Sequence, residues 1–409
     1  MKIKPQTPKG FRDFLPSAAT RRAFLLDKLT LTFKKYGFEP LETPAVEFAQ
    51  TLKGKYGEEE KLIYEFSDRG GRELALRYDQ TVPLSRVIAT YPTLPKPFKR
   101  YQTQVVWRAD NPQAGRFREF LQVDFDTVGS SSFLSDAEII ACALEAMNKI
   151  GFKEYYLRIN TRDTFKGLPK KVISALDKLK KLSEQEVVRE ISKSGFNLEK
   201  AKEVLVKIKE SKPPRQIEEL FNLFSPIGID KNRVIFDPTL ARGLDYYTGV
   251  IFEMEVEGYQ TGSVGGGGRY DNLIGSFTGK ETPAVGFSFG FDRLLDAANS
   301  QGLLPEDKAT TTVLVTILGD KSLESSLKIA SKLRNAGINT EVYLEQLGGK
   351  KISLEKQLKY ADKKNIPFAI IIGEKEQQEK TVTLKNLSTK KQETIDVISV
   401  IDKIRLSQT

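Results

Sequence analysis

Residues 98–129, FKRYQTQVVWRADNPQAGRFREFLQVDFDTVG, form the segment that decides the fold. Two stretches of alternating polarity flank a loop that contains Asn111, Pro112 and Gly115. Alternation with a period of two is typical of a strand with one buried face, and Asn, Pro and Gly are typical of turns. The segment therefore predicts two strands joined as an antiparallel hairpin.

The second strand of this hairpin has one polar and one apolar face. Side chains of one parity share a face, which groups two sets: Arg118, Gln122, Asp124 and Asp126 on one side, and Phe117, Leu121, Val123 and Phe125 on the other. Arg108 ends the first strand and Arg116 lies in the loop, so two guanidiniums converge on a carboxylate-lined floor. A planar guanidinium suits phosphate oxygens. We favour a ligand site over a merely charged, exposed face.

A second polar group lies in ARGLDYYTGVIFEMEV, residues 241–256. The second half of this stretch alternates as a strand with one buried face. Its first half gathers Arg242, Asp245, Tyr246 and Tyr247 close to two glycines, Gly243 and Gly249. A strand alone needs neither these charges nor these phenols, so the group indicates a binding site at the start of the strand.

Two further features are weaker when taken alone. The glycine run over 262–268 lacks the Lys-Ser/Thr ending of a phosphate-binding loop, and we interpret it as a place where backbone approaches a ligand or another strand. Arg293, in GFSFGFDRLL, is expected to open a helix directly after a strand. In isolation it would be an ordinary surface arginine.

Composition excludes several kinds of chemistry. The 409 residues include no histidine and one cysteine, which excludes histidine-dependent nucleophilic catalysis, histidine metal sites and a cysteine zinc cluster. Cys142 falls in SDAEIIACALEAMNKIG, where Ser135 and Glu138 predict the capping box of a helix and Cys142 a buried position. Neither a signal peptide nor a membrane-spanning segment is recognisable, so a soluble, cytoplasmic protein is expected.

The chain is long enough for two or three domains. An amphipathic helix is expected over 18–36. Residues 165–232 have a helical period and many lysines, and they predict an inserted helical module. The last hundred residues alternate strands and helices, which predicts a compact α/β domain with a largely parallel sheet. The net charge of +10 favours a polyanionic partner.

Together these segments resemble class II aminoacyl-tRNA synthetases, and within them the histidyl-tRNA synthetase family, over essentially the whole chain. YGFEPLETP, WRADNPQAGRFREF and GFSFGFDR are similar to the three class motifs. RGLDYYTG and GGGGRYDNL resemble the histidine-specific signatures, and PKGFRDFLP and LRYDQTVP are further marks of the family. LGGKKISLEKQLKYADKKNIPFAIIIGEKE is similar to its anticodon-binding domain.

The resemblance implies an α+β fold in three parts. A catalytic domain built on an antiparallel sheet with helices is expected over 1–164 and 233–306. A helical insertion is expected over 165–232, where it would clamp the acceptor stem, and a C-terminal α/β anticodon-binding domain over 310–409. The first motif implies a homodimer.

The resemblance also assigns roles residue by residue. Arg242 would contact the histidine carboxylate and the α-phosphate of ATP, and Arg108 the α-phosphate. Arg116 would hold the outer phosphates, Arg293 would stack on adenine, and Asp110 would lie near the nucleotide. The other roles concern histidine: Asp79, Thr81 and Gln122 would hold its α-amino group, and Asp126, Tyr246 and Tyr247 would contact its side chain. Many bacterial members carry glutamate in place of Asp126.

The implied reaction is ATP-dependent ligation of L-histidine to its tRNA through histidyl-adenylate, with Mg²⁺ accompanying ATP and no protein side chains assigned as metal ligands. The attacking carboxylate is already ionised, so no general base is required. No membrane or DNA partner is expected. The main alternative is a catalytically silent paralogue that senses histidine. Such paralogues usually lack the anticodon domain and the intact RGLDYY signature, both of which are present here.

Overall fold

The computed structural model describes residues 3–113, 115–179, 182–241, 246–306, 309–344 and 353–407. The chain divides into two compact units, Met1–Leu304 and Pro305–Thr409. Within the described ranges, no helix is both long enough and apolar enough to cross a lipid bilayer.

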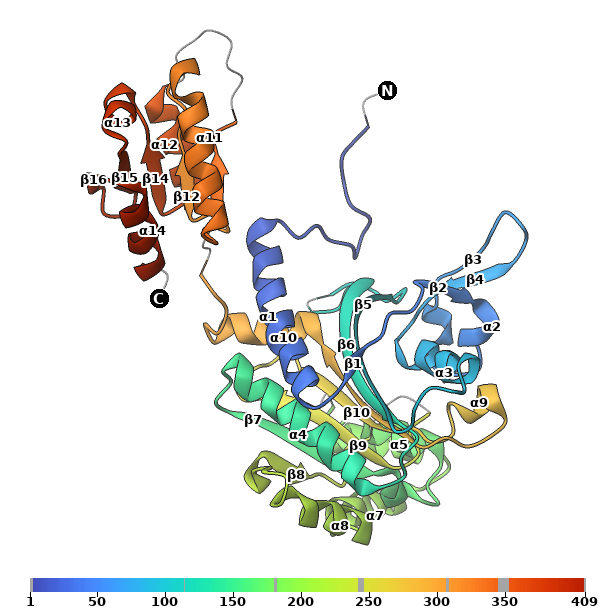
Figure 1. Ribbon diagram of the computed structural model, residues 1–409. Coiled ribbons are helices and arrows are strands. Elements are labelled where there is room, and N and C mark those ends of the chain that lie inside the picture. The colour runs from blue at the N-terminus through green and yellow to red at the C-terminus, as the bar shows by residue number, and fades with distance from the viewer. Residues whose placement is uncertain are drawn as a thin grey trace. The chain divides into compact units, whose positions relative to one another are not determined.

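The first unit is built on an eight-stranded sheet in the order β1-β5-β6-β11-β10-β9-β7-β8. Its strands are β1 Glu39–Pro40, β5 Phe98–Trp107, β6 Glu119–Val128, β7 Tyr155–Thr161, β8 Val234–Phe236, β9 Val250–Val256, β10 Gly265–Arg269 and β11 Ala284–Gly290. β1 and β8 pair in parallel with their neighbours, and all other pairs are antiparallel. The predicted hairpin is confirmed, because β5 and β6 lie side by side (Figure 1) and pair from Phe98↔Val128 to Trp107↔Glu119.

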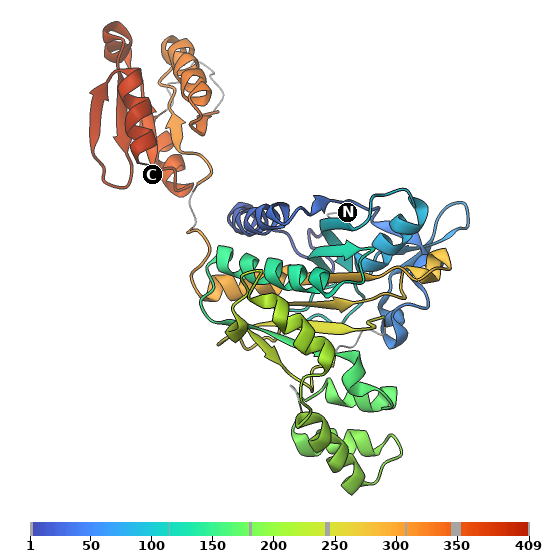
Figure 2. The ribbon, with the colours of Figure 1, turned by 60° about the horizontal axis from the view of Figure 1, so that its bottom comes forward.

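Helices cover one face of this sheet (Figure 2). They are α1 Pro16–Lys35, α4 Phe133–Ile150, α8 Arg215–Phe224 and α10 Phe291–Ser300. Phe33 of α1 stacks on Phe125 of β6 with ring centroids 4.7 Å apart, and Cys142 of α4 is buried as predicted. Since Phe125 faces the helices, the polar side chains of β6 lie on the opposite face, which the helices leave open.

A smaller three-stranded sheet packs beside the open face. It consists of β2 Val46–Phe48, β4 Glu73–Leu76 and β3 Glu65–Ser67, with α2 Ala49–Leu52 and the 3-10 helix η1 Gly57–Leu62 between β2 and β3. α3 Thr81–Thr90 follows β4 after four residues, and this connection contains Asp79.

The predicted helical segment contains α5 Lys170–Leu176, α6 Glu184–Ser192 and α7 Leu198–Lys209. These three pack around a core of their own, which Val187, Ile191 and Leu205 help to form. α8 instead packs with α4 in the core of the large sheet. Two short 3-10 helices, η2 Arg162–Phe165 and η3 Lys231–Arg233, flank the segment, and α9 Gly275–Thr278 lies between β10 and β11. The bounds 165–232 for an insertion stay a prediction.

The second unit is an α/β domain with a five-stranded sheet in the order β13-β12-β14-β15-β16. Its elements are β12 Val313–Val315, α11 Asp320–Asn335, β13 Thr340–Val342, α12 Leu354–Lys363, β14 Phe368–Ile371, α13 Glu374–Glu379, β15 Val382–Asn386, β16 Gln392–Ile395 and α14 Val397–Leu406. β12, β13 and β14 are parallel, whereas β15 and β16 add antiparallel pairs.

Two sequence predictions need correction. The sheet of the second unit is parallel only in part, because residues 382–395 form a hairpin. Its turn has no glycine or proline; Asn386 Oδ1 accepts from the Ser388 and Thr389 amides at 3.0 Å, and Lys390 takes a positive φ of 59°. The predicted capping box of α4 is also wrong. Ser132 caps that helix instead, since its hydroxyl accepts from the Leu134 amide at 3.2 Å.

Candidate active site

A cavity of about 400 Å³ opens on the polar face of the large sheet, opposite the face that α1, α4, α8 and α10 cover. That volume suits a small organic ligand. Every predicted site residue within the described ranges lines the cavity: Asp79, Thr81, Arg108, Asp110, Arg116, Gln122, Asp126, Tyr246, Tyr247 and Arg293. The predicted Arg242 lies outside the described residues. Segments more than 200 residues apart in the chain thus meet at one site.

The floor of the cavity is formed by the polar face of β6. Gln122, Asp124 and Asp126 alternate along the strand and are all buried. Asp126 accepts a hydrogen bond from the Tyr270 hydroxyl at 2.6 Å and forms an ion pair with Arg100 at 2.8 Å. A carboxylate has about four acceptor positions, so Asp126 retains capacity for one more donor from a ligand.

Glycines make room for this floor. A Cβ at Gly286, which pairs with Asp126, would lie 1.8 Å from Asp126 Oδ1. A Cβ at Gly267 on β10 would lie 2.0 Å from the Gly286 carbonyl oxygen. Gly265, Gly266 and Gly267 also line the cavity. The prediction that the glycine run permits close backbone approach is confirmed.

Asp79 and Thr81 form one wall, at the junction between β4 and α3. Asp79 Oδ1 accepts from the Tyr56 hydroxyl at 2.9 Å and from the Val82 amide at 3.1 Å. Its Oδ2 is buried and has no hydrogen-bond partner among the described residues. Burial raises the pKa of Asp79, although Val82, Tyr56 and Arg108 oppose the shift. This wall therefore offers a buried acceptor to a cationic ligand.

Tyr246 and Tyr247 form a second wall, with ring centroids 5.0 Å apart, and Tyr246 hydrogen-bonds Thr81 of the first wall. Burial raises the pKa of Tyr246 well above its ordinary value, and Tyr247 and Asp79 add to the shift. The Tyr246 phenol is therefore protonated at neutral pH and can donate a hydrogen bond.

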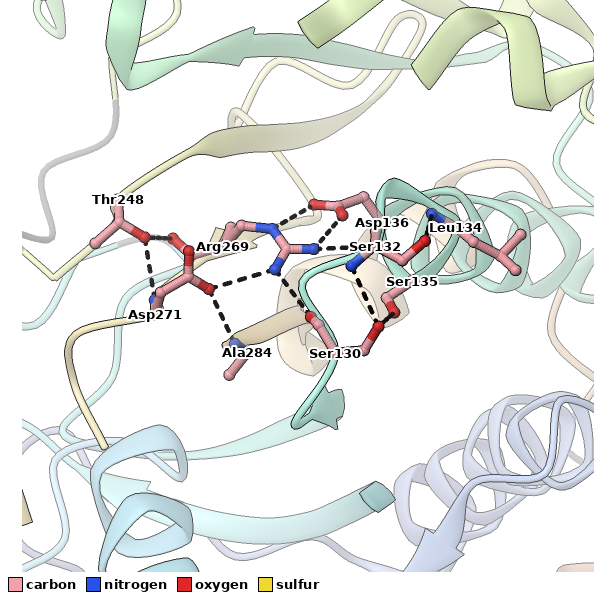
Figure 3. Close-up of polar contacts among 9 residues, drawn as sticks. All are labelled: Ser130, Ser132, Leu134, Ser135, Asp136, Thr248, Arg269, Asp271 and Ala284. Atoms are coloured by element: carbon pink, nitrogen blue, oxygen red, sulfur yellow. Dashed lines mark hydrogen bonds and ion pairs between the residues drawn. The ribbon is translucent and has the colours of Figure 1, made fainter. Parts of the chain in front are cut away.

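The chain just beyond these tyrosines is held by a buried ion pair between Arg269 and Asp136 (Figure 3). Arg269 also donates to the carbonyl oxygens of Ser130 at 3.0 Å and Ser132 at 3.3 Å, which ties the end of β10 to the start of α4. The Thr248 amide donates to the Arg269 carbonyl oxygen at 2.8 Å. Thr248 directly follows Tyr247, so this network fixes where the tyrosine wall ends.

Arginines gather at the other end of the cavity. Arg108 donates to the Tyr78 carbonyl oxygen at 3.2 Å and lies over the Tyr78 ring, 4.2 Å from its centroid. Arg116 pairs with Asp110 at 2.8 Å. Arg293, in the first turn of α10, donates to the Ser263 carbonyl oxygen at 3.4 Å. The cavity thus has an acidic end and a cationic end, an arrangement suited to a ligand with a positive group and several phosphates.

Comparison with known proteins agrees with this arrangement. The family model described as histidyl-tRNA synthetase matches residues 10–185 and 168–294, and the one described as anticodon binding domain matches 312–406. The chain belongs to the histidyl-tRNA synthetase family. It is 37% identical to a histidine–tRNA ligase of Cytophaga hutchinsonii over 98% of this chain and 99% of the relative. It is 38% identical to a histidine–tRNA ligase of Aeropyrum pernix over 93% of this chain and 93% of that relative.

A solved member of the family has the same fold. The crystal structure of histidyl-tRNA synthetase from Nostoc sp. PCC 7120 aligns with a TM-score of 0.85 and 31% identity, and the alignment covers 99% of this chain and 100% of that one. The class II fold expected from the sequence is therefore confirmed, including a C-terminal domain of the anticodon-binding type.

Two residues that support the site, one of them lining the cavity, lie outside the sequence predictions. Arg100, on β5, is fully buried and pairs with Asp126. Ser288, on β11, accepts a hydrogen bond from Gln122 Nε2 at 2.9 Å. The first could have been found from the hairpin, since antiparallel pairing in the observed register puts Arg100 opposite Asp126. The second depends on the pairing of β6 with β11, strands separated by more than 150 residues.

The carboxylates of the site do not form a metal-binding cage. Among the described residues, no group of three or more Asp, Glu, Cys or His side chains is arranged to hold a metal ion. Asp110 is paired with Arg116, and Glu59 accepts from the Tyr78 hydroxyl at 2.6 Å. A divalent cation in this cavity would therefore depend mainly on ligand phosphates for coordination.

Proposed function

We propose that this protein attaches L-histidine to its tRNA at the expense of ATP, through a histidyl-adenylate intermediate. Membership of the histidyl-tRNA synthetase family supports the proposal over nearly the full chain length. The observation that carries it is the cavity, where the acidic floor and the cationic end suit an amino acid and ATP bound side by side. The anticodon-type domain over 312–406 supports tRNA as the acceptor.

The acidic end would bind histidine. The Asp79 carboxylate, the Thr81 hydroxyl and the Gln122 amide oxygen are suited to the α-ammonium group, because two of them are buried acceptors with a free position among the described residues. Tyr246, Tyr247 and Asp126 would contact the imidazole. A wrong amino acid would leave these buried polar groups unpaired, which would provide selectivity.

The cationic end would bind ATP as its Mg²⁺ complex. In our proposal Arg108 contacts the α-phosphate, Arg116 holds the outer phosphates, and Arg293 stacks on adenine. Asp110, the ion-pair partner of Arg116, lies near the nucleotide. On balance the acidic and phenolic neighbours of Arg108, with Tyr78 first, raise its pKa against the effect of burial. Arg108 therefore stays charged where negative charge develops in the transition state. Arg242 keeps its proposed contact with the histidine carboxylate and the α-phosphate.

The first step forms a bond between a histidine carboxylate oxygen and the α-phosphorus, and pyrophosphate leaves. In the second step, a hydroxyl of the terminal ribose of the tRNA attacks the histidyl carbonyl carbon, and AMP leaves. The side chains of the cavity position both reactants and offset charge, so a chain without histidine can carry out the reaction.

ATP–pyrophosphate exchange, measured with each amino acid in turn and without tRNA, tests the proposal. We expect exchange with histidine alone. Binding of histidine without exchange would contradict the proposal and favour the histidine-sensor alternative.

We also propose a homodimer. Val46, Phe48 and Phe66 of the small sheet are 37%, 51% and 42% exposed, a cluster of apolar side chains that a partner subunit would cover. Sedimentation of the protein and of Phe48→Asp tests this, with a dimer expected for the first and a shift to monomer for the second. A monomeric parent protein would contradict the proposal.

A further inference from the structure

The cavity floor contains one acidic residue to which the proposed function assigns no role. Asp124 lies between Gln122 and Asp126 on β6, is 2% exposed, and lines the cavity. Its Oδ1 has no hydrogen-bond partner among the described residues. The groups that interact with it electrostatically include Arg100 on β5, Asp126 on β6, Asp79 before α3, and Tyr246.

Asp124 is connected to Gln122 through Ser288. Ser288 lies opposite Asp124 in the antiparallel pair of β11 and β6, and its hydroxyl hydrogen-bonds the Asp124 side chain. On its other side, Ser288 Oγ accepts from Gln122 Nε2 at 2.9 Å. A chain of hydrogen bonds therefore runs from the Gln122 amide through the Ser288 hydroxyl to the Asp124 carboxylate.

The direction of these hydrogen bonds follows from the number of protons that each group can donate. A serine hydroxyl has one proton to donate, and a carboxylate can only accept once it is ionised, as Asp124 is above the pKa of about 7 that burial gives it. Once the Ser288 proton is committed to Asp124, Ser288 Oγ can only accept from Gln122. The Gln122 amide must then turn its NH₂ group toward Ser288 and its oxygen away from it. Gln122 Oε1 is indeed left buried, without a partner among the described residues, in the wall of the cavity.

We propose that Asp124 and Ser288 are positioning residues that fix the orientation of the Gln122 amide, so that its oxygen rather than its NH₂ group meets the substrate's ammonium group. The inference rests on the proposed function and deepens it. Without the Ser288 hydroxyl, the amide can rotate by half a turn and present a donor to a cation. The effect should therefore fall on recognition of the α-ammonium group and spare recognition of the imidazole.

The test compares two ligands that differ only in the α-ammonium group. The dissociation constants of L-histidine and of its des-amino analogue, 3-(imidazol-4-yl)propionate, are measured by calorimetry at pH 8, where Asp124 is ionised, for the full chain and its variants. In Ser288→Ala we expect the preference for histidine over the analogue to fall about tenfold, the size expected for one hydrogen bond to a charged group. The affinity for the analogue should stay the same.

Two variants separate positioning from general damage. Ser288→Thr keeps a hydroxyl on a strand and should restore the preference, whereas Ser300→Ala, at the end of α10, should leave it unchanged. Equal weakening of both ligands in Ser288→Ala, or an unchanged preference, would overturn the inference while the proposed function stands. A parent protein that binds histidine no better than the analogue would overturn the inference directly, and one without histidine-dependent pyrophosphate exchange would overturn the proposed function.

Discussion

Arg100 and Asp126 face each other across β5 and β6 and form an ion pair 2.8 Å long. Arg100 is 0% exposed and Asp126 is 3% exposed. Removing a charge from water is costly, so such a pair is poor evidence for added stability. Its position suggests another role. Arg100 is a cation beside the acidic floor, on the neighbouring strand β5, and it opposes the effect of burial, which raises the pKa of both Asp124 and Asp126.

Replacing Arg100 should therefore destabilise the folded protein. Arg100→Met would leave buried carboxylates without their cation, and we expect the free energy of unfolding to fall by about 3–5 kcal/mol. Arg72→Met is the matched control, because Arg72 pairs with Asp68 at the surface with 68% of its side chain exposed, and should cost less than about 1 kcal/mol. Urea unfolding measures both. An equal loss of unfolding free energy in the two variants would show that the buried pair contributes no more to stability than the surface pair.

Asp124 should make the stability of the ligand-free protein depend on pH. Burial raises its pKa from 3.8 to about 7, with Arg100 opposing and Asp126 adding to the shift. Between these values the folded state binds more protons than the unfolded state, so the free energy of unfolding falls as pH rises, by up to about 1.4 kcal/mol per pH unit.

Asp124→Asn removes this titration. At pH 8 the variant should be more stable than the parent protein, and this advantage should shrink steadily as the pH is lowered to 4. Urea unfolding at pH 4, 6 and 8, without histidine, provides the comparison. An advantage that is the same at all three pH values would argue that Asp124 does not titrate in this range.

Gly286 should tolerate no side chain. In Gly286→Ala the new Cβ would lie 1.8 Å from Asp126 Oδ1, and a strand at the centre of the sheet cannot move aside cheaply. We expect about 1–3 kcal/mol of lost stability and loss of histidine-dependent exchange. Gly290→Ala is the control for stability, since its Cβ would lie 3.7 Å from its nearest neighbour, the Val264 carbonyl oxygen. A fully stable, active Gly286→Ala protein would contradict the geometry of the floor.

Arg108 should act through the shape of its guanidinium as well as its charge. Arg108→Lys keeps the charge but loses the planar fork, and we expect the rate of pyrophosphate exchange to fall about 100-fold with little change in the affinity for histidine. Arg158→Lys, on β7 and paired with Glu255, is the control. Exchange that survives in Arg108→Lys would remove Arg108 from its proposed contact with the α-phosphate.

The local pattern of polar and apolar residues was enough to predict the β5–β6 hairpin. The alternation in 98–129 specified the hairpin and the face on which Gln122 and Asp126 lie, because both depend on residues close in sequence. The same kind of reasoning missed Ser288, whose importance comes from the pairing of distant strands. It also placed the start of α4 three residues late, because Ser135 and Glu138 match a capping box by sequence, whereas Ser132, the observed cap, has no Glu or Gln three residues later.

The measurement that tests the central claim most directly is the charging of tRNA. The purified protein is incubated with ATP, Mg²⁺, labelled histidine and a histidine tRNA transcript, and the acid-stable label on the tRNA is followed over time. We predict that label accumulates only when ATP is present, and that it fails to accumulate when another tRNA is supplied. A protein that exchanges pyrophosphate with histidine but never labels the tRNA, under any of these conditions, would contradict the account.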